Sequence, residues 1–314
     1  MFIFLLCFIL CLISMSGKQE GHNSKIINKS NSEILKDNKY SSLDKIVNEN
    51  NDKIVVSIVP LENDDTPYYK NENRTYVSAS MIKLLILAEF IEQIDKKEIT
   101  LETKYILKEE DIVGGSGIIQ NMTIGTEFEY DTLALYMIMY SDNTATNVLI
   151  DILGMDRINE KSKKLGLKDA QLNRKMMQWN GTENYINSKD IEILLKGFIN
   201  NSIGSEKMCK KSIEYLLKTI DNNAIAKGLP NGTKFAHKTG DLTKIRHDGG
   251  IVYVKMKYII IVLTKGFEDI NDSYKLMANI SYIAYNIIEN NDYSNSQNYL
   301  NYVSLFAFIL LFLF

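Results

Sequence analysis

Short β-branched segments occur near both ends of this chain and are separated by a long stretch of helical pattern. The first pair covers residues 53–60 and 66–77, and the last three cover 234–239, 249–255 and 258–264. Segments of this length and composition predict buried strands. All five strands can form one antiparallel sheet if the first two strands join the last three. We therefore predict an α/β fold: a five-stranded antiparallel sheet flanked by helices, with an inserted all-α lobe.

The helical pattern divides the chain into two parts. Apolar spacing predicts helices at 31–51, 81–94, 130–139, 147–153, 155–165, 188–199, 210–220 and 270–290. We expect a discontinuous α/β domain of residues 31–79 and 226–292, and a helical lobe of residues 80–225. Two irregular stretches, 113–121 and 170–186, interrupt the lobe. A cleft is expected between the two parts.

The N-terminal end carries an uninterrupted apolar run followed by small residues. This pattern is typical of a secretory signal, so we expect residues 1–16 to be a signal segment, 17–30 a spacer, and the protein to be extracytoplasmic or secreted. Cys7 and Cys11 lie inside that segment, and their removal would leave Cys209 without an internal disulfide partner. Attachment of a lipid at Cys11 is an alternative.

The C-terminal end, residues 293–314, is a polar spacer followed by an apolar tail. The last 12 residues are apolar apart from Ser304, which is too short for a typical membrane-spanning helix. The tail can be an anchor, a segment removed during lipid attachment, or a final helix packed on the body. Membrane association through either end is therefore one expectation.

The net charge disfavours some kinds of partner. The chain has 36 basic and 39 acidic residues, a formal net charge of −3, so no basic excess indicates nucleic acid. Its three histidines are not clustered with cysteines at ligand spacing, and we expect neither a metal nor a cofactor. Gly114 to Gly117 lack the strand and the lysine of a phosphate loop and predict a cleft-rim loop.

Ser80 and Lys83 lie where a predicted strand gives way to the most apolar helix. At this spacing the two side chains share a helix face, so the amine can act as a base toward the hydroxyl. A serine in the first helical turn also has a free backbone N–H nearby, which can stabilise an oxyanion. Ser42 and Lys45 have the same spacing, so the motif alone is not specific.

Two further motifs follow in order: Ser141-Asp142-Asn143 after an apolar helix, and Lys238-Thr239-Gly240 in a predicted strand. Together with Ser80 and Lys83, the set resembles the serine β-lactamases and penicillin-binding proteins, most closely class A β-lactamases. The resemblance covers roughly residues 40–290. It implies an enzyme that acts on a small β-lactam or a cell-wall D-alanyl peptide, and we expect a monomer.

The resemblance implies a role for each motif residue. Ser80 would be the nucleophile, Lys83 its activating amine with a pKa depressed by burial beside Lys238, and Ser141 the proton relay to the leaving nitrogen. The substrate would be bound by Asn143, Lys238, Thr239 and Gly240. The side chains of Lys238 and Thr239 would bind its carboxylate. The N–H of Asp241 would be the second oxyanion donor.

The loop that supplies the deacylating base in class A enzymes departs from the family. Aligning Leu172-Asn173-Arg174 with the family's Leu-Asp-Arg places Met176 where the glutamate stands, and a thioether cannot activate water. The same alignment places Asn180 at the water-positioning asparagine. Glu183 can be a substitute base or a partner of Arg174, and Gln178 can only position water. Fast deacylation is therefore in doubt.

Other residues near the expected cleft have less specific signals. His247 can carry a proton with Asp248 orienting it, or both can belong to a turn; His237 is expected to pack. Tyr105 can stack on substrate. Trp179, Met176 and Met177 are expected to pack the irregular loop.

Three functions follow from this sequence. The first is an exported serine hydrolase that forms an acyl-enzyme through Ser80, with slow deacylation. The second is a non-hydrolytic protein that captures penicillins or muropeptides. The third is a hydrolase of other small amides or esters.

Overall fold

The computed structural model describes residues 39–62, 66–179 and 181–289. The chain divides into Met1–Ser42, described only at residues 39–42, and Leu43–Phe314, whose architecture follows. The predicted signal segment, the N-terminal spacer and the C-terminal tail lie outside the described residues and stay predictions. None of the helices in the described ranges is long and apolar enough to cross a membrane.

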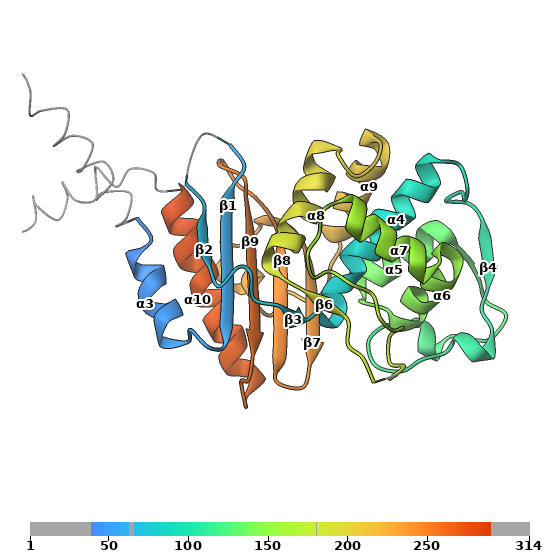
Figure 1. The fold of residues 1–314 in the computed structure, drawn as a ribbon, viewed down its shortest axis with the longest axis horizontal. Coiled ribbons are helices and arrows are strands. Elements are labelled where there is room, and N and C mark those ends of the chain that lie inside the picture. The colour runs from blue at the N-terminus through green and yellow to red at the C-terminus, as the bar shows by residue number, and fades with distance from the viewer. Residues whose placement is uncertain (1–38, 63–65, 180, 290–314) are drawn as a thin grey trace, which may run out of the picture. The chain divides into compact units, whose positions relative to one another are not determined.

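One five-stranded sheet organises the fold (Figure 1). Its strands, in spatial order, are β2 (Tyr68–Lys70), β1 (Ile54–Pro60), β9 (Tyr258–Lys265), β8 (Ile245–Tyr253) and β7 (Lys234–Leu242). Every neighbouring pair is antiparallel, and β1 pairs directly with β9 from the other end of the chain. The predicted sheet, with the first strands joining the last three, is confirmed.

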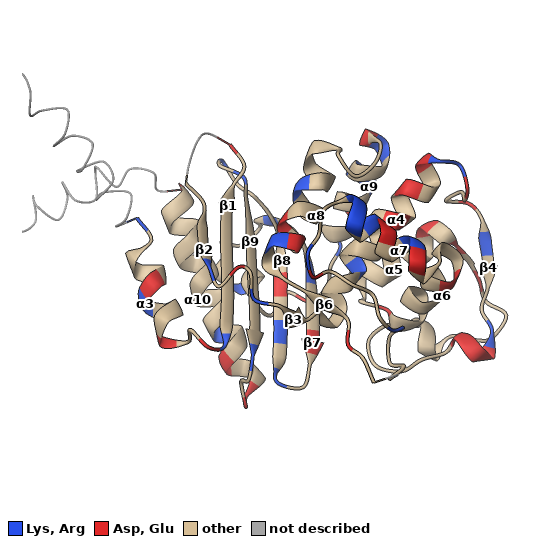
Figure 2. Cartoon of the chain, in the orientation of Figure 1, with Lys and Arg blue, Asp and Glu red and all other residues tan. Residues whose placement is uncertain are grey.

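Helices cover both faces of the sheet. Every residue of β1 from Ile54 to Val59 is buried, which requires cover on both sides. α8 (Ser188–Asn200) contacts β1, β8 and β9, and α10 (Ile270–Glu289) contacts β8 and β9. α3 (Ser41–Glu49) buries Leu43 and Val47. Figure 2 shows no charged residue on β1, whereas β7 and β8 contain charged residues.

The helices between the strands pack around α4 (Lys83–Asp95). Its residues from Lys83 to Phe90 are all buried, as expected of a helix that is apolar on every side. α4 contacts α5 (Tyr130–Met139), α6 (Asn143–Leu153), α7 (Met155–Lys164), α8 and α9 (Glu206–Leu216). The short 3₁₀ turn η1 (Ala79–Ile82) leads into α4, and η4 (Ile225–Gly228) packs on α10. The division into an α/β domain and a helical lobe stays a prediction.

Several predicted boundaries differ from the structure. The strand predicted at 66–77 is split, because a turn with Asn71 at φ 59° separates β2 from β3 (Tyr76–Val77). β3 leaves the sheet and pairs with β6 (Tyr185–Ile186). β8 begins at Ile245, four residues before the predicted start. The antiparallel pair of β4 (Lys104–Ile106) and β5 (Glu127–Glu129) was not predicted, because strands of three residues leave little pattern in the sequence.

Candidate active site

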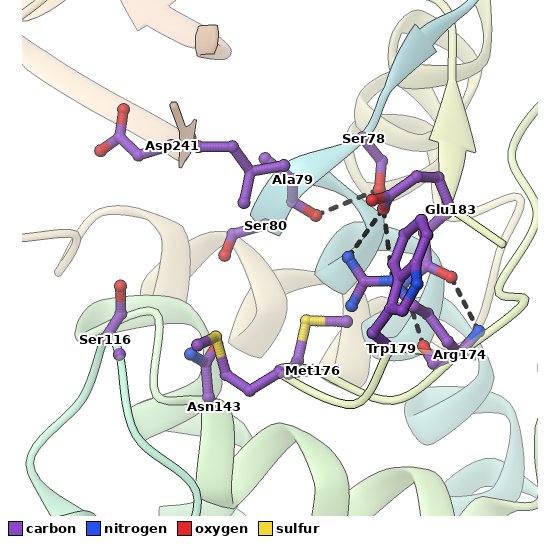
Figure 3. Close-up of a pocket in the computed structure, with 14 residues that line it drawn as sticks. Ser78, Ala79, Ser80, Ser116, Asn143, Arg174, Met176, Trp179, Glu183 and Asp241 are labelled. Atoms are coloured by element: carbon purple, nitrogen blue, oxygen red, sulfur yellow. Dashed lines mark hydrogen bonds and ion pairs between the residues drawn. The ribbon is translucent and has the colours of Figure 1, made fainter. Parts of the chain in front are cut away.

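Ser80 lies in η1, immediately before α4, and lines a cavity of about 330 Å³ (Figure 3). The preceding residue, Ala79, has φ 45°, a left-handed conformation that is strained for a side chain other than glycine. Ser78 anchors this turn, because its N–H donates to the Asn184 carbonyl at 2.7 Å. The strained turn presents the Ser80 hydroxyl to the cavity, where a nucleophile needs to be.

β7 passes close to this turn at Gly240. A Cβ atom at Gly240 would lie 3.1 Å from the Ser80 nitrogen and 3.2 Å from the Ala79 Cβ. The Thr239 carbonyl accepts from Lys238 Nζ at 2.7 Å, so it points away from β8, along the open edge of β7. Because backbone groups alternate along a strand, the Asp241 N–H faces the same edge. The two predicted oxyanion donors, the N–H groups of Ser80 and Asp241, therefore belong to neighbouring backbones.

Two lysines converge on Ser141, which follows α5 and has φ 52°. The Ser141 Oγ lies 3.1 Å from Lys83 Nζ and 3.0 Å from Lys238 Nζ. Lys83 also donates to the Ser141 carbonyl at 2.7 Å and to Asn143 Oδ1 at 3.0 Å. In the described part of the chain, no hydrogen bond joins Lys83 to the Ser80 hydroxyl. Such catalytic contacts often tighten only when substrate binds.

Burial changes the protonation of both lysines. Burial, and then the charge of Lys238, hold the pKa of Lys83 well below its ordinary value. Burial, and then the charge of Arg246, lower the pKa of Lys238 to about 7. Three buried positive charges, on Lys83, Lys238 and Arg246, raise the free energy of the folded protein, so the lysine amines lose a proton easily. Lys83 is thus prepared to be a neutral base.

The predicted cleft-rim loop, which contains Gly114 to Gly117, holds Asn143 in place. Asn143 Nδ2 donates to the Gly114 carbonyl at 3.1 Å, and its backbone N–H donates to the Ser116 carbonyl at 3.0 Å. Asp142 accepts from the N–H groups of Ile118 and Ile119 at 2.7 and 2.8 Å. The predicted cleft-rim loop is therefore tied to the start of α6.

The irregular loop after α7 forms another wall of the cavity. Asn147 on α6 holds Met176 through both backbone groups, accepting from its N–H at 2.7 Å and donating to its carbonyl at 3.0 Å. No sequence motif marks Asn147, which is one of many asparagines in this chain. Arg174 pairs with Glu183 at 2.7 Å, so of the two alternatives for Glu183 the structure shows the pairing (Figure 3). Asn180 lies outside the described residues.

Two expectations for packing residues were wrong. Met177 and Trp179 are 60% and 68% exposed and line the cavity, and Trp179 contacts the loop through the Arg174 guanidinium, 5.9 Å from its ring. Met176 also lines the cavity but is buried, as expected. Met177 has φ 60°, a left-handed backbone conformation. The hydroxyl of Tyr105 donates to Asp111 at 2.8 Å. The described cavity lining includes neither Tyr105 nor Gln178.

The predicted pairing of His247 with Asp248 was also wrong. Neighbouring residues in a strand face opposite sides of the sheet, and both residues lie within β8. His247 Nε2 donates to the Val77 carbonyl at 2.9 Å, while its Nδ1 accepts from the Thr264 N–H at 3.2 Å. Asp248 instead bonds His237 Nδ1 at 2.8 Å. Burial lowers the pKa of His247 to about 4, so the ring is uncharged near neutral pH and does not take up a second proton.

Arg246 is a charged residue at the site to which the sequence assigned no role of its own. It lies opposite Asp241 in the register of β7 and β8, and its side chain is 1% exposed. It bonds Asp241 through Nη1 and Asp221 through Nη2, the latter at 2.6 Å. Among the described residues, no group of three or more His, Cys, Asp or Glu could hold a metal ion.

Comparisons with known proteins agree with this geometry. Residues 38–288 match the model of the β-lactamase enzyme family (Beta-lactamase2). A β-lactamase of Proteus vulgaris is 24% identical over 200 residues, 60% of this chain and 71% of that protein. The solved β-lactamase of Sphaerobacter thermophilus is 25% identical, with a TM-score of 0.75, over 80% of this chain and 98% of its own.

PBP-A has a similar fold. Its leucine-to-glutamate variant, solved as an acyl-enzyme complex with penicillin G, is 24% identical, with a TM-score of 0.74. That alignment covers 80% of this chain and 96% of PBP-A. Because the family model spans most of the chain, and the fold agrees with that of a solved β-lactamase, this protein belongs to the β-lactamase enzyme family and is a β-lactamase-like serine hydrolase.

Proposed function

We propose that this protein is an exported enzyme that opens β-lactam rings, or cleaves related D-alanyl peptides, through an acyl-enzyme on Ser80. The observation that carries the proposal is the position of Ser80 at the cavity, on a strained turn, beside buried lysines that converge on Ser141. Export rests on the apolar N-terminal run alone.

In the acylation step, neutral Lys83 takes the proton from Ser80 Oγ as the oxygen attacks the lactam carbonyl carbon. The N–H groups of Ser80 and Asp241 stabilise the negative charge that forms on the carbonyl oxygen. The carbon–nitrogen bond then breaks, and the nitrogen receives its proton through Ser141, which contacts both lysines. The product is an ester of Ser80.

The second step, attack of water on this ester, is proposed to be slow. The sequence alignment puts Met176 where class A β-lactamases carry a glutamate, and Asn147 binds the Met176 backbone through two hydrogen bonds. Glu183 is held by Arg174 and has its carboxylate committed to that pair. The same observation favours a second candidate function, long-lived capture of penicillins or muropeptides without turnover.

A fluorescent penicillin tests the acylation step. The full chain is expected to form a covalent adduct, and Ser80→Ala is expected to form none, as measured by gel fluorescence and intact-protein mass spectrometry. Label that appears on the wild-type protein and persists in Ser80→Ala would sink the assignment of the nucleophile. Loss of the label within seconds would show fast turnover and contradict slow deacylation.

Met176→Glu is predicted to shorten the lifetime of the adduct. A carboxylate at this position would supply the missing general base, and base catalysis is worth about 10²–10⁴-fold. We expect at least a tenfold faster loss of label after free penicillin is removed. Met176→Gln has a similar size but no base and is the matched control. An equal lifetime in both variants would show that the loop alignment is wrong.

A further inference from the structure

Asp241 places a carboxylate at the end of the cleft where a substrate carboxylate is expected to bind. Its side chain is 42% exposed, and the residue lines the same cavity as Ser80. In Figure 3 its carboxylate points away from the Ser80 hydroxyl, so it borders the reaction centre without filling it. Nothing in the acylation step uses this carboxylate, because only the Asp241 backbone N–H takes part.

The carboxylate of Asp241 is bound to a buried cation, Arg246, whose side chain is 1% exposed. Arg246 bonds Asp241 through one terminal nitrogen and Asp221 through the other. The Tyr274 ring lies 4.5 Å from the guanidinium carbon. Two carboxylates therefore surround one guanidinium, and the cluster as a whole is negative.

This cluster acts on the groups predicted to receive the substrate carboxylate. Asp241, on the same strand as Lys238, and Asp221 both attract the protonated Lys238 amine and so offset part of the lowering of its pKa that burial causes. A substrate carboxylate has to compete with them for the charge of Lys238. Thr239 and Asp241 are two residues apart on β7, so their side chains share a face about 7 Å apart. A substrate carboxylate at Lys238 and Thr239 would meet the negative charge of Asp241. The neighbouring cation, Arg246, is already paired with Asp241 and Asp221.

We propose that Asp241 is a specificity-determining residue that disfavours substrates with a carboxylate beside the scissile amide, relative to the same compounds with a neutral group there. A bound carboxylate must either displace Asp241 from Arg246 or accept its repulsion. An uncharged substrate encounters neither cost. This inference rests on the proposed acylation of Ser80, and its test separates the two.

Benzylpenicillin and its methyl ester are matched probes, because they differ at the carboxylate and share the reacting ring. The second-order rate of Ser80 acylation by each is measured on the full chain by intact-protein mass spectrometry. Asp241→Asn keeps the size of the side chain and removes its charge. We expect the ratio of the acid rate to the ester rate to rise about tenfold in this variant.

Asp272→Asn, on the exposed first turn of α10, is the matched control for the change in net charge, and its ratio is expected to equal that of the wild type. Asp221→Asn removes the other carboxylate on Arg246 and is expected to raise the ratio as well, which keeps the test decisive if Asp241→Asn folds poorly. A ratio within twofold of wild type in both Asp241→Asn and Asp221→Asn, with Ser80 still acylated, overturns the inference and leaves the proposed function intact. Absence of any Ser80 adduct with either probe overturns both.

Discussion

Single residues in the cleft owe their chemistry to the charges around them. Lys83 and Lys238 share the Ser141 hydroxyl, at 3.1 and 3.0 Å, and neither amine is exposed to water. Burial and mutual repulsion lower the pKa of Lys83, as the sequence predicted. The structure adds Arg246, whose charge is the second cause of the lowered pKa of Lys238. One lysine can thus lose a proton while another cation remains for the substrate.

The pKa of Lys238 predicts an alkaline limb in the acylation of benzylpenicillin. Below about pH 7 the amine is protonated and attracts the substrate carboxylate, and above it this attraction is lost. The rate constant for acylation at low substrate concentration should fall as pH rises from 7 to 9. Lys238→Arg, which stays charged, should lack this limb. An identical decline with the methyl ester would contradict the assignment, because that probe has no carboxylate.

At the scale of elements, the approach of β7 to η1 determines whether the site can work. The two backbones come so close at Gly240 that a methyl group would press on the Ser80 nitrogen, the Ala79 Cβ and Met81 Cγ, at 3.1 to 3.3 Å. The sequence motif marked Gly240 as a place for substrate. The structure adds a second reason for glycine at this position: β7 must lie against the turn that carries the nucleophile.

Gly240→Ala is therefore predicted to impair acylation more than stability. The added methyl requires a shift of a few tenths of an ångström between β7 and η1, which displaces the oxyanion donors. Misplacement by about 1 Å can cost 10²-fold in rate, so we expect about a tenfold slower acylation of Ser80 by the fluorescent penicillin. The melting temperature should change by only a few degrees. An unchanged acylation rate would show that the two backbones do not form one site.

At the scale of the whole molecule, buried polar residues join elements that are distant in sequence. His247 on β8 bonds Val77 on β3 and Thr264 on β9, and its ring packs edge-on against Tyr76. His237 on β7 bonds Asp248 on β8, which also accepts from the Ile225 N–H of η4. These contacts fix β7 and β8 between the helices, and they explain why neither histidine belongs to the reacting groups.

His247 predicts how stability depends on pH. Its pKa is about 4 in the folded protein and about 6.5 in the unfolded chain, so between these values the unfolded state binds more protons. The contribution of His247 to the free energy of unfolding should be complete above pH 6.5 and fall by about 3 kcal/mol as pH drops to 4. Urea unfolding at pH 4.5 and 7 measures it. His247→Gln cannot titrate and should lose less stability; equal losses would disprove the role of this residue.

Sequence patterns alone were enough to predict the strands of the main sheet, their union in one sheet, and the residues of the three motifs. Local periodicity and motif order carry that information, because they depend on neighbours in the chain. Where the pattern was short or interrupted it failed, as at β4, β5 and the turn that separates β2 from β3.

The partners of the side chains depend on the three-dimensional fold. It placed Glu183 on Arg174, Asp248 on His237 and Asp241 on Arg246, and it exposed Met177 and Trp179 to the cavity. These outcomes depend on which strand faces which helix and on the direction in which each strand residue points. A shift of one residue along a strand reverses the face, so spacing in the sequence cannot determine a partner that lies on another element.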